Sequence, residues 1–195
     1  AGIYDAYHKG LARVSEIEGV KLLARSGKDA DSQKTQGESV LACTDAQTFR
    51  KNPELSGEVF GPFSILVSAP SISELEEIAQ DLEGQLTATV HGTIGDFQKA
   101  GKLLRQLERK AGRLILNGFP TGVEVCPAMN HGGPYPATTD VRFTSVGTAA
   151  IYRFARPICY QDFPPSLLPP ALRNENPSGI RRIVNGKPSQ DAVAG

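Results

Sequence analysis

The apolar residues in the middle of the chain alternate between strand-like runs and helical stripes, and this order constrains the fold more than any other feature. Runs at 63–67, 86–90 and 114–116 flank two stripes at helical spacing, at 72–82 and 97–107. Strand, helix, strand, helix, strand with short connections is the order expected of a parallel sheet with right-handed crossovers. We therefore predict the α/β class, with a buried strand at 63–67.

Polar and glycine residues predict where the two helices begin and end. Ser73 with Glu76 fits a capping box at the start of the first helix, and Gly84 follows its last apolar residue. Gly112 is expected to end the second helix.

Ahead of this region the pattern predicts one helix, two short strands and a second, shorter helix. The first helix, at 3–17, has a stripe at spacings of four and three, formed by Ile3, Tyr7, Leu11 and Val14. The strands are expected at 20–24 and 40–43, with a polar loop at 26–37 between them and the short helix at 45–51.

The composition of the chain changes after Asn117. Residues 118–140 are dense in Gly and Pro, and a loop this long inside a compact domain is more often functional than not. A last short helix or strand is expected within 143–154. We assign 1–160 to one α/β unit and 161–195 to an extended Pro-rich and polar tail.

Composition excludes several classes of protein. The 195 residues carry 21 basic and 21 acidic side chains, so the net charge gives no basis for a nucleic-acid or membrane partner. Three Cys at irregular spacing form neither a disulfide framework nor a CxxC pair, and no ligand spacing suggests a metal. Without a signal peptide or a long apolar run, we expect a cytoplasmic protein. The chain opens at Ala1 inside a predicted helix, which favours truncation of a longer protein.

Several motifs in a fixed order carry a resemblance to a known family. The heptad Gly57-Glu-Val-Phe-Gly-Pro-Phe63 resembles the Glu-Ile/Val-Phe-Gly-Pro motif of the aldehyde dehydrogenase superfamily. The stretch Ala111-Gly-Arg-Leu-Ile-Leu-Asn117 resembles a strand of that family, and His131-Gly-Gly-Pro134 follows where the family often has Pro-Phe-Gly-Gly. The resemblance covers 3–156 and implies the C-terminal part of the catalytic domain.

Further segments resemble one subgroup of the family. Phe119-Pro-Thr-Gly-Val-Glu-Val125, Met129-Asn-His-Gly-Gly-Pro-Tyr-Pro-Ala-Thr138 and Ile180-Arg-Arg-Ile-Val-Asn-Gly186 are similar to the α-ketoglutaric semialdehyde (2,5-dioxopentanoate) dehydrogenases. A bacterial NADP-linked fatty aldehyde dehydrogenase is the alternative within the family. A stand-alone binding module that reuses the fold is the alternative outside it.

The resemblance implies an oxidation of an aldehyde with NAD or NADP. In the family a Cys thiolate attacks the carbonyl, hydride passes to the nicotinamide, and a Glu-activated water hydrolyses the thioester. Both residues lie upstream of the Glu-Val-Phe-Gly-Pro motif, which places them before Ala1. We therefore assign no catalytic residue to this chain, and we expect it alone to be inactive and to bind no cofactor.

The three cysteines of the chain are weaker candidates for the nucleophile. Cys43 lies in an apolar, strand-like segment and is expected to be a packed core thiol. Cys159 lies in the tail between Ile and Tyr. Cys126 lies in the 118–140 loop, where lining a pocket is favoured over catalysis.

Two residues of the motif are the predicted cofactor contacts. By resemblance, the Glu58 carboxylate accepts hydrogen bonds from the hydroxyls of the nicotinamide ribose, and two acceptor oxygens suit a vicinal diol. Phe60 packs beside the nicotinamide ring by the same resemblance, with a core role as its alternative. Gly61 and Pro62 are expected to shape the turn.

The 118–140 loop is the predicted substrate wall, lined by Phe119, Val123, Cys126 and His131. His131 replaces the aromatic residue often found there, and it either faces the substrate or hydrogen-bonds the loop backbone. Arg142 and Arg156 could pair with a substrate carboxylate, although surface salt bridges are favoured for both. His91 is expected at a strand end and His8 in solvent. Exposed apolar faces predict self-association, and the resemblance implies a homo-oligomer because enzymes of this family are dimers or tetramers.

Overall fold

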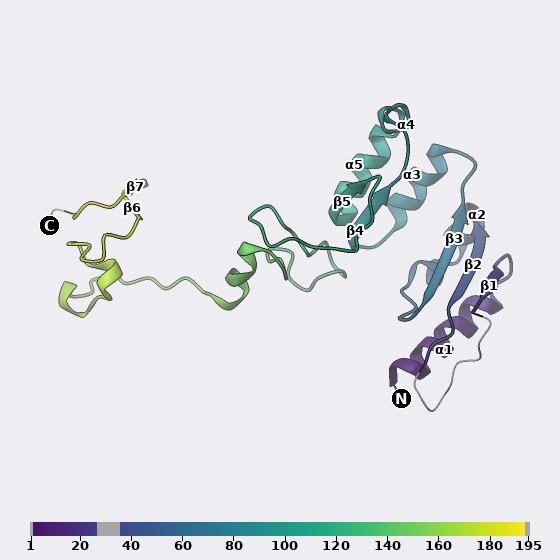
Figure 1. Ribbon diagram of the computed structural model, residues 1–195, viewed down its shortest axis with the longest axis horizontal. Coiled ribbons are helices and arrows are strands. Elements are labelled where there is room, and N and C mark those ends of the chain that lie inside the picture. The colour runs from purple at the N-terminus through teal and green to yellow at the C-terminus, as the bar shows by residue number, and fades with distance from the viewer. Residues whose placement is uncertain (1, 27–35, 194–195) are drawn as a thin grey trace. The chain divides into compact units, whose positions relative to one another are not determined.

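The computed structural model describes residues 2–26 and 36–193 (Figure 1). The chain divides into two compact units, Ala1–Phe154 and Ala155–Gly195. The predicted loop at 26–37 lies mostly outside the described residues. Among the described helices, none is long and apolar enough to cross a membrane.

A helix and a three-stranded sheet open the first unit. The helix is α1 (Gly2–Glu16), and the sheet has the order β1 (Lys21–Arg25), β2 (Val40–Asp45), β3 (Phe63–Ser68). Strand β1 is antiparallel to β2, whereas β2 and β3 run parallel with Val40 opposite Phe63.

The predicted stripe on α1 faces this sheet except at its first residue. Tyr7, Leu11 and Val14 are buried, and Tyr7 and Leu11 pack in one cluster with Val40. Ile3 is 67% exposed, so the core begins one turn later than the stripe suggested.

Strand β3 is half-buried rather than buried as we predicted. Its residues alternate, with Phe63, Ile65 and Val67 facing the core while Leu66 on the other face is 56% exposed. Side chains on a strand point to opposite faces in turn, so an apolar run of five cannot show whether both faces are covered.

Two helices follow the strands of this sheet. Helix α2 (Ala46–Lys51) is capped by Asp45, whose Oδ1 accepts the Thr48 N–H at 2.8 Å, and η2 (Pro53–Ser56) follows it. Helix α3 (Ile72–Asp81) is capped by Ser71, which corrects our assignment of Ser73. Both serines precede a Glu by three residues, and the helix uses the earlier one because Ile72 is already helical.

The second sheet of the first unit is a parallel pair of strands, β4 (Gln85–Val90) and β5 (Ala111–Leu116). The connection contains two helices, α4 (Ile94–Lys99) and α5 (Gly101–Lys110), where we predicted one. The break is at Ala100, which has ψ near 15°. Gly112 lies within β5, so our prediction that it ends the helix is wrong.

The parallel pairs occur in two sheets, not in one sheet through β3, β4 and β5. Strand β3 pairs with β2, and β4 pairs with β5. Helix α3 leads from the first sheet to the second and packs on α5 through Ala79, Ala100 and Leu103. The α/β class is confirmed; the order of elements predicts crossovers but does not say which strands are neighbours.

Residues 118–147 contain no helix or strand, as the loop prediction required, and η3 (Thr148–Phe154) ends the first unit.

The second unit holds η4 (Pro165–Leu167), η5 (Pro170–Leu172) and a hairpin of β6 (Arg182–Val184) and β7 (Lys187–Ser189). We had predicted an extended tail there. Asn185 (φ 46°) and Gly186 (φ 79°) form the hairpin turn, and the Asn-Gly pair is the typical signal for it.

Candidate functional site

The motif loop, residues 57–62, is held by the apolar core of the first sheet. Val59 packs in that core against the clusters around Leu11 and Val14. Its neighbours Glu58 and Phe60 are exposed, Phe60 to 62%. The loop therefore uses one residue as an anchor and presents the two predicted cofactor contacts to the outside.

Tyr7 fixes the other end of the motif loop. A Cβ at Gly61 would lie 2.3 Å from Cδ2 of Tyr7, so only glycine allows the backbone to pass this close to the ring. The Tyr7 hydroxyl donates to the backbone oxygen of Glu38, and burial, then the Glu38 carboxylate, raises the pKa of that hydroxyl. Val40 N–H donates to Pro62 O at 2.9 Å, which ties the loop to the start of β2.

The substrate loop, residues 118–140, contacts the sheet β4–β5 backbone to backbone. A Cβ at Gly112 would lie 1.8 Å from Gly132 O, and one at Gly133 would lie 2.3 Å from Gln85 O. A Cβ at Gly84 would lie 2.2 Å from Pro134 O. The segment 132–134 therefore crosses the first residues of both strands with no side chain between them.

Two residues that the sequence analysis did not assign to the site hold the beginning of the substrate loop. Asn117 follows β5 with φ 52°, and its side chain donates to Gly92 O and accepts the Gly92 N–H, both at 2.9 Å. Arg113 in β5 donates to Gly122 O at 2.8 Å and to Pro120 O at 3.3 Å. Their partners are backbone groups, which leave no signal in the sequence.

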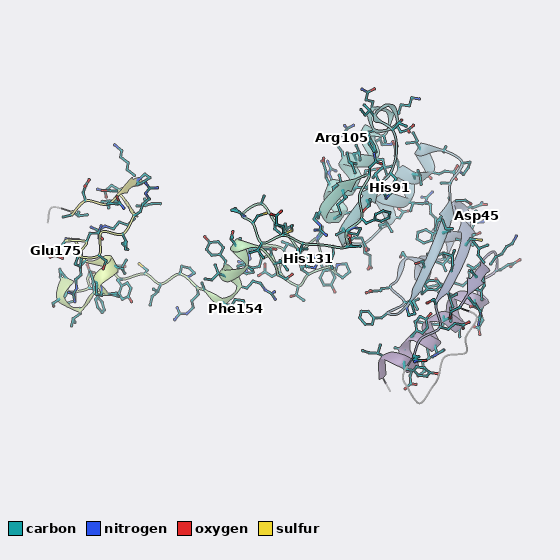
Figure 2. All side chains as sticks on the ribbon, viewed as in Figure 1. Asp45, His91, Arg105, His131, Phe154 and Glu175 are labelled. Carbon is teal, nitrogen blue, oxygen red and sulfur yellow. The ribbon has the colours of Figure 1, made fainter. Side chains whose placement is uncertain are left out.

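The four predicted substrate residues do not share one cavity. Phe119 is 77% exposed, and its ring lies 5.2 Å from the ring of His91. Figure 2 shows where His91 lies, just after β4. Val123 is 44% exposed. Cys126 is half-buried, and its backbone oxygen accepts from Met129 N–H and Thr148 N–H.

His131 lines a cavity of about 390 Å³ in the first unit. Its ring nitrogen Nδ1 is buried and has no hydrogen-bond partner among the described residues. The cavity is also lined by Leu86, Ala137, Thr138, Thr139, Asp140, Phe143, Ser145 and Arg153. Asp140 pairs with Arg142 through two hydrogen bonds, and that guanidinium lowers the pKa of the carboxyl to about 2. Arg142 is thus the salt-bridge residue we favoured.

Two other predicted residues differ in part from expectation. Cys43 is only half-buried, on the β2 face opposite Val40 and Ala42, and so is no core thiol. His8 is also half-buried, between the rings of Tyr4 and Tyr7, and not in solvent. Within 2–26 and 36–193, no group of three His, Cys, Asp or Glu side chains could hold a metal ion.

Comparison with characterised proteins gives close relatives. No family model matches the chain. The chain is 48% identical over 186 residues to α-ketoglutaric semialdehyde dehydrogenase 2 of Azospirillum brasilense, covering 95% of this chain and 35% of that protein. It is 43% identical over 190 residues to the α-ketoglutaric semialdehyde dehydrogenase of Acinetobacter baylyi, covering 97% and 36%. The chain thus spans about a third of the length of these relatives.

Solved structures with the same fold are aldehyde dehydrogenases. The Δ-pyrroline-5-carboxylate dehydrogenase of Mycobacterium tuberculosis matches 86% of this chain and 31% of its own with a TM-score of 0.59 and 16% identity. Betaine aldehyde dehydrogenase of Staphylococcus aureus, solved in complex with NAD+, matches 79% and 28% with a TM-score of 0.53 and 18% identity. The predicted similarity to the C-terminal part of the aldehyde dehydrogenases, and to the α-ketoglutaric semialdehyde subgroup, is confirmed.

Proposed function

We propose that this chain forms part of an NAD(P)-dependent aldehyde dehydrogenase that oxidises α-ketoglutaric semialdehyde to the carboxylic acid. The observation that carries the proposal is the 48% identity to the Azospirillum enzyme, which extends over 95% of the chain. In the reaction the aldehyde carbon loses a hydride and gains an oxygen from water, and the bound nicotinamide accepts the hydride.

The geometry of the motif loop supports a contact with the cofactor. The Glu58 side chain is exposed and makes no hydrogen bond or ion pair within the described part of the chain, so its two oxygens are free to accept from a diol. Phe60, two residues further along the loop, is also exposed and offers an aromatic surface to a planar ring. We assign Glu58 to the ribose hydroxyls and Phe60 to the nicotinamide ring.

We assign Phe119, Val123, Cys126 and His131 to the substrate wall. All four lie in the segment held by Asn117, Arg113 and the glycine contacts, so the position of this wall depends on the sheet β4–β5. Three of them offer apolar or weakly polar side chains to the carbon chain of an aldehyde, and His131 offers a hydrogen bond.

None of the three cysteines is assigned as the nucleophile. A catalytic thiolate in this family precedes the Glu-Val-Phe-Gly-Pro motif, and Cys126 and Cys159 follow it. Cys43 lies in β2, where it is half-buried on one face of the first sheet, and it is not part of the substrate loop. Replacing any one of them by Ala in the complete gene product is expected to leave measurable turnover.

We also propose a homo-oligomer in the cytoplasm. All three cysteines are free, which suits a reducing compartment. Leu23 and Leu66 are each more than half exposed on the sheet β1–β2–β3, and exposed apolar surface of this kind favours association.

The test is nicotinamide reduction with α-ketoglutaric semialdehyde by this chain and by the complete product of its gene. The complete product is expected to be active and the 195 residues alone inactive. Glu58→Gln should slow hydride transfer by about tenfold, since a neutral amide accepts a diol less well. Glu54→Gln, an exposed Glu in η2, is the matched control.

Three outcomes would contradict the proposal. Activity with a long-chain aldehyde alone would favour a fatty aldehyde dehydrogenase, and no activity with any aldehyde would favour a binding module. Activity of the 195 residues alone would make one of the three cysteines the nucleophile.

A further inference from the structure

We propose that Thr144 and Ser145 are positioning residues that fix His131 in the substrate wall and thereby set the preference for an oxo-acid aldehyde. This inference rests on the proposed function. It concerns residues that contact His131 only through its backbone, and that no sequence motif identified.

Both polar groups of the His131 backbone are held by these two residues. The His131 N–H donates to Thr144 Oγ1 at 2.7 Å. The His131 carbonyl oxygen accepts from Ser145 N–H at 3.0 Å and from Ser145 Oγ at 2.9 Å. Three hydrogen bonds from adjacent residues therefore hold the two peptide groups that flank His131.

The hydroxyl of Thr144 has a defined orientation. Thr144 is 7% exposed, and its Oγ1 donates to Val146 O at 2.6 Å. With its only proton engaged there, the oxygen can receive the His131 N–H through a lone pair. A buried Val at this position would leave the His131 N–H unsatisfied, whereas a Ser would keep both bonds.

The segment around His131 has little freedom beyond these bonds. Asn130 donates from Nδ2 to Gly112 O at 3.0 Å, and the next residue, Gly132, is the one that meets Gly112 backbone to backbone. The imidazole is therefore aimed by two side-chain torsions from a fixed backbone.

The ring has one nitrogen left for a ligand. Nδ1 is buried and has no partner among the described residues, and His131 lines the cavity that Thr138, Phe143 and Arg153 also line. Because protein atoms enclose Nδ1, we assign Nε2 as the nitrogen that contacts a ligand. An oxo-acid aldehyde carries keto and carboxylate oxygens for this contact, and an unsubstituted aldehyde of the same length carries none.

The experiment measures kcat and KM of the complete gene product with α-ketoglutaric semialdehyde and with an unsubstituted aldehyde of the same length. We expect Thr144→Val to lower kcat/KM for the semialdehyde about tenfold, mostly through KM, and to change the other aldehyde less than about twofold. Ser145→Ala should cost about threefold, because the Ser145 N–H still donates. Thr144→Ser should restore the wild-type ratio. Thr148→Val, at an exposed Thr at the start of η3, is the control.

A double-mutant cycle with His131→Ala separates positioning from a general structural role. If Thr144 acts through His131, Thr144→Val has no further effect on the substrate ratio once the imidazole is gone. Equal losses for both aldehydes, or a full additional effect in the His131→Ala background, would overturn the inference. If Thr144→Val does not fold, the ratio of kcat/KM for the two aldehydes is measured in Ser145→Ala, with Thr144→Ser as its control. A ratio that is unchanged in Ser145→Ala would then overturn the inference. If the wild type is active but its ratio of kcat/KM for the two aldehydes does not change in the Thr144 and Ser145 variants, this inference alone is refuted. If the wild type is inactive with both aldehydes, the proposed function is refuted.

Discussion

The motif loop and the substrate loop are held in place by different kinds of contact. In the motif loop Val59 enters the apolar core, and Gly61 lies against the ring of Tyr7. The substrate loop contributes little to that core and is fixed by backbone contacts at glycines and by hydrogen bonds from Arg113 and Asn117. The first loop is packed against side chains, which can move slightly, whereas the tightest contacts of the second loop are between backbone atoms, which cannot.

This difference gives the two halves of the proposed site different tolerances. A side-chain contact that becomes too tight is relieved by a rotamer change, at a cost typical of overpacking. A backbone contact is relieved only by moving the loop, which also moves the residues on it. Mutations should therefore disturb the substrate wall more than the cofactor contacts.

The largest expected effect comes from Gly112→Ala. The new methyl group would lie 1.8 Å from Gly132 O, so the 132–134 segment must leave the sheet. We expect a loss of about 3 kcal/mol in the free energy of unfolding, the upper end of overpacking, and a large loss of aldehyde turnover. Chemical denaturation of the complete gene product measures the first.

Gly95→Ala is the control for Gly112→Ala. A Cβ at Gly95, within α4, would meet only Thr93 Oγ1 at 3.8 Å. Here alanine should be neutral or stabilise by about 0.5–1 kcal/mol. Equal stability of the two variants would contradict the backbone contact at Gly112.

Gly61→Ala is the matching test in the motif loop, with a smaller effect. The methyl group would meet the buried Tyr7 ring, and small shifts of both the ring and the loop can share the clash, so we expect a cost of about 2 kcal/mol. Tyr7→Leu in the same chain should make the two costs less than additive, because the smaller side chain leaves room. Strict additivity would show that the ring is not what Gly61 accommodates.

The sequence predicts the structure around the motif loop far better than the contacts that hold the substrate loop. Period-3.6 and period-2 patterns locate α1, α3 and most strands, because core packing repeats along each element. The Glu-Val-Phe-Gly-Pro motif singles out Glu58 and Phe60, and the structure exposes both on either side of the packed Val59. Our prediction of an extended tail missed the hairpin at Asn185-Gly186, although that pair is a direct signal for such a turn.

The parts that could not be predicted depend on contacts between distant backbone groups. In the sequence Arg113 is an ordinary strand residue, and only the structure shows that it donates to loop carbonyl groups. Thr144 is likewise one of several loop threonines, and nothing in the sequence marks it as the acceptor of the His131 N–H. Ser71 and Ser73 both satisfy the capping pattern, so the choice depends on the turn that precedes the helix. Strand pairing likewise depends on long-range packing rather than on local spacing.

Arg113→Met tests a smaller element of the substrate loop. It keeps most of the apolar stem but leaves Gly122 O and Pro120 O without this donor, at a cost of about 1 kcal/mol. Hydrogen exchange of the 118–124 amides should accelerate, while the motif loop is unchanged. Arg105→Met on α5 (Figure 2) is the control, because Arg105 is exposed and makes no hydrogen bond among the described residues. Faster exchange in both variants would contradict a specific role for Arg113.

Acidification is expected to have the smallest effect and to separate two kinds of paired carboxylate. Arg142 lowers the pKa of Asp140 from its ordinary value of 3.8 to about 2, and the Thr93 side chain lowers the pKa of Asp96. A depressed pKa in the folded state contributes stability that is full above the unfolded value and is lost as the pH falls through the folded one. The melting temperature should therefore be flat above about pH 5 and decline from about pH 4 to pH 2.

Asp140→Asn and Asp96→Asn assign that decline to its sources. Each variant should differ from the wild type by a constant amount above pH 5, and the difference should shrink as the pH falls through the folded pKa of each carboxyl, which is about 2 for Asp140. The Asp140 difference should also shrink in high salt, because its partner Arg142 is an exposed cation, whereas Asp96 relies on a hydroxyl and a backbone N–H. If high salt leaves both differences unchanged, the Asp140 carboxylate is held by its backbone bond and not by the guanidinium. The substrate loop would then owe its order even more fully to backbone contacts.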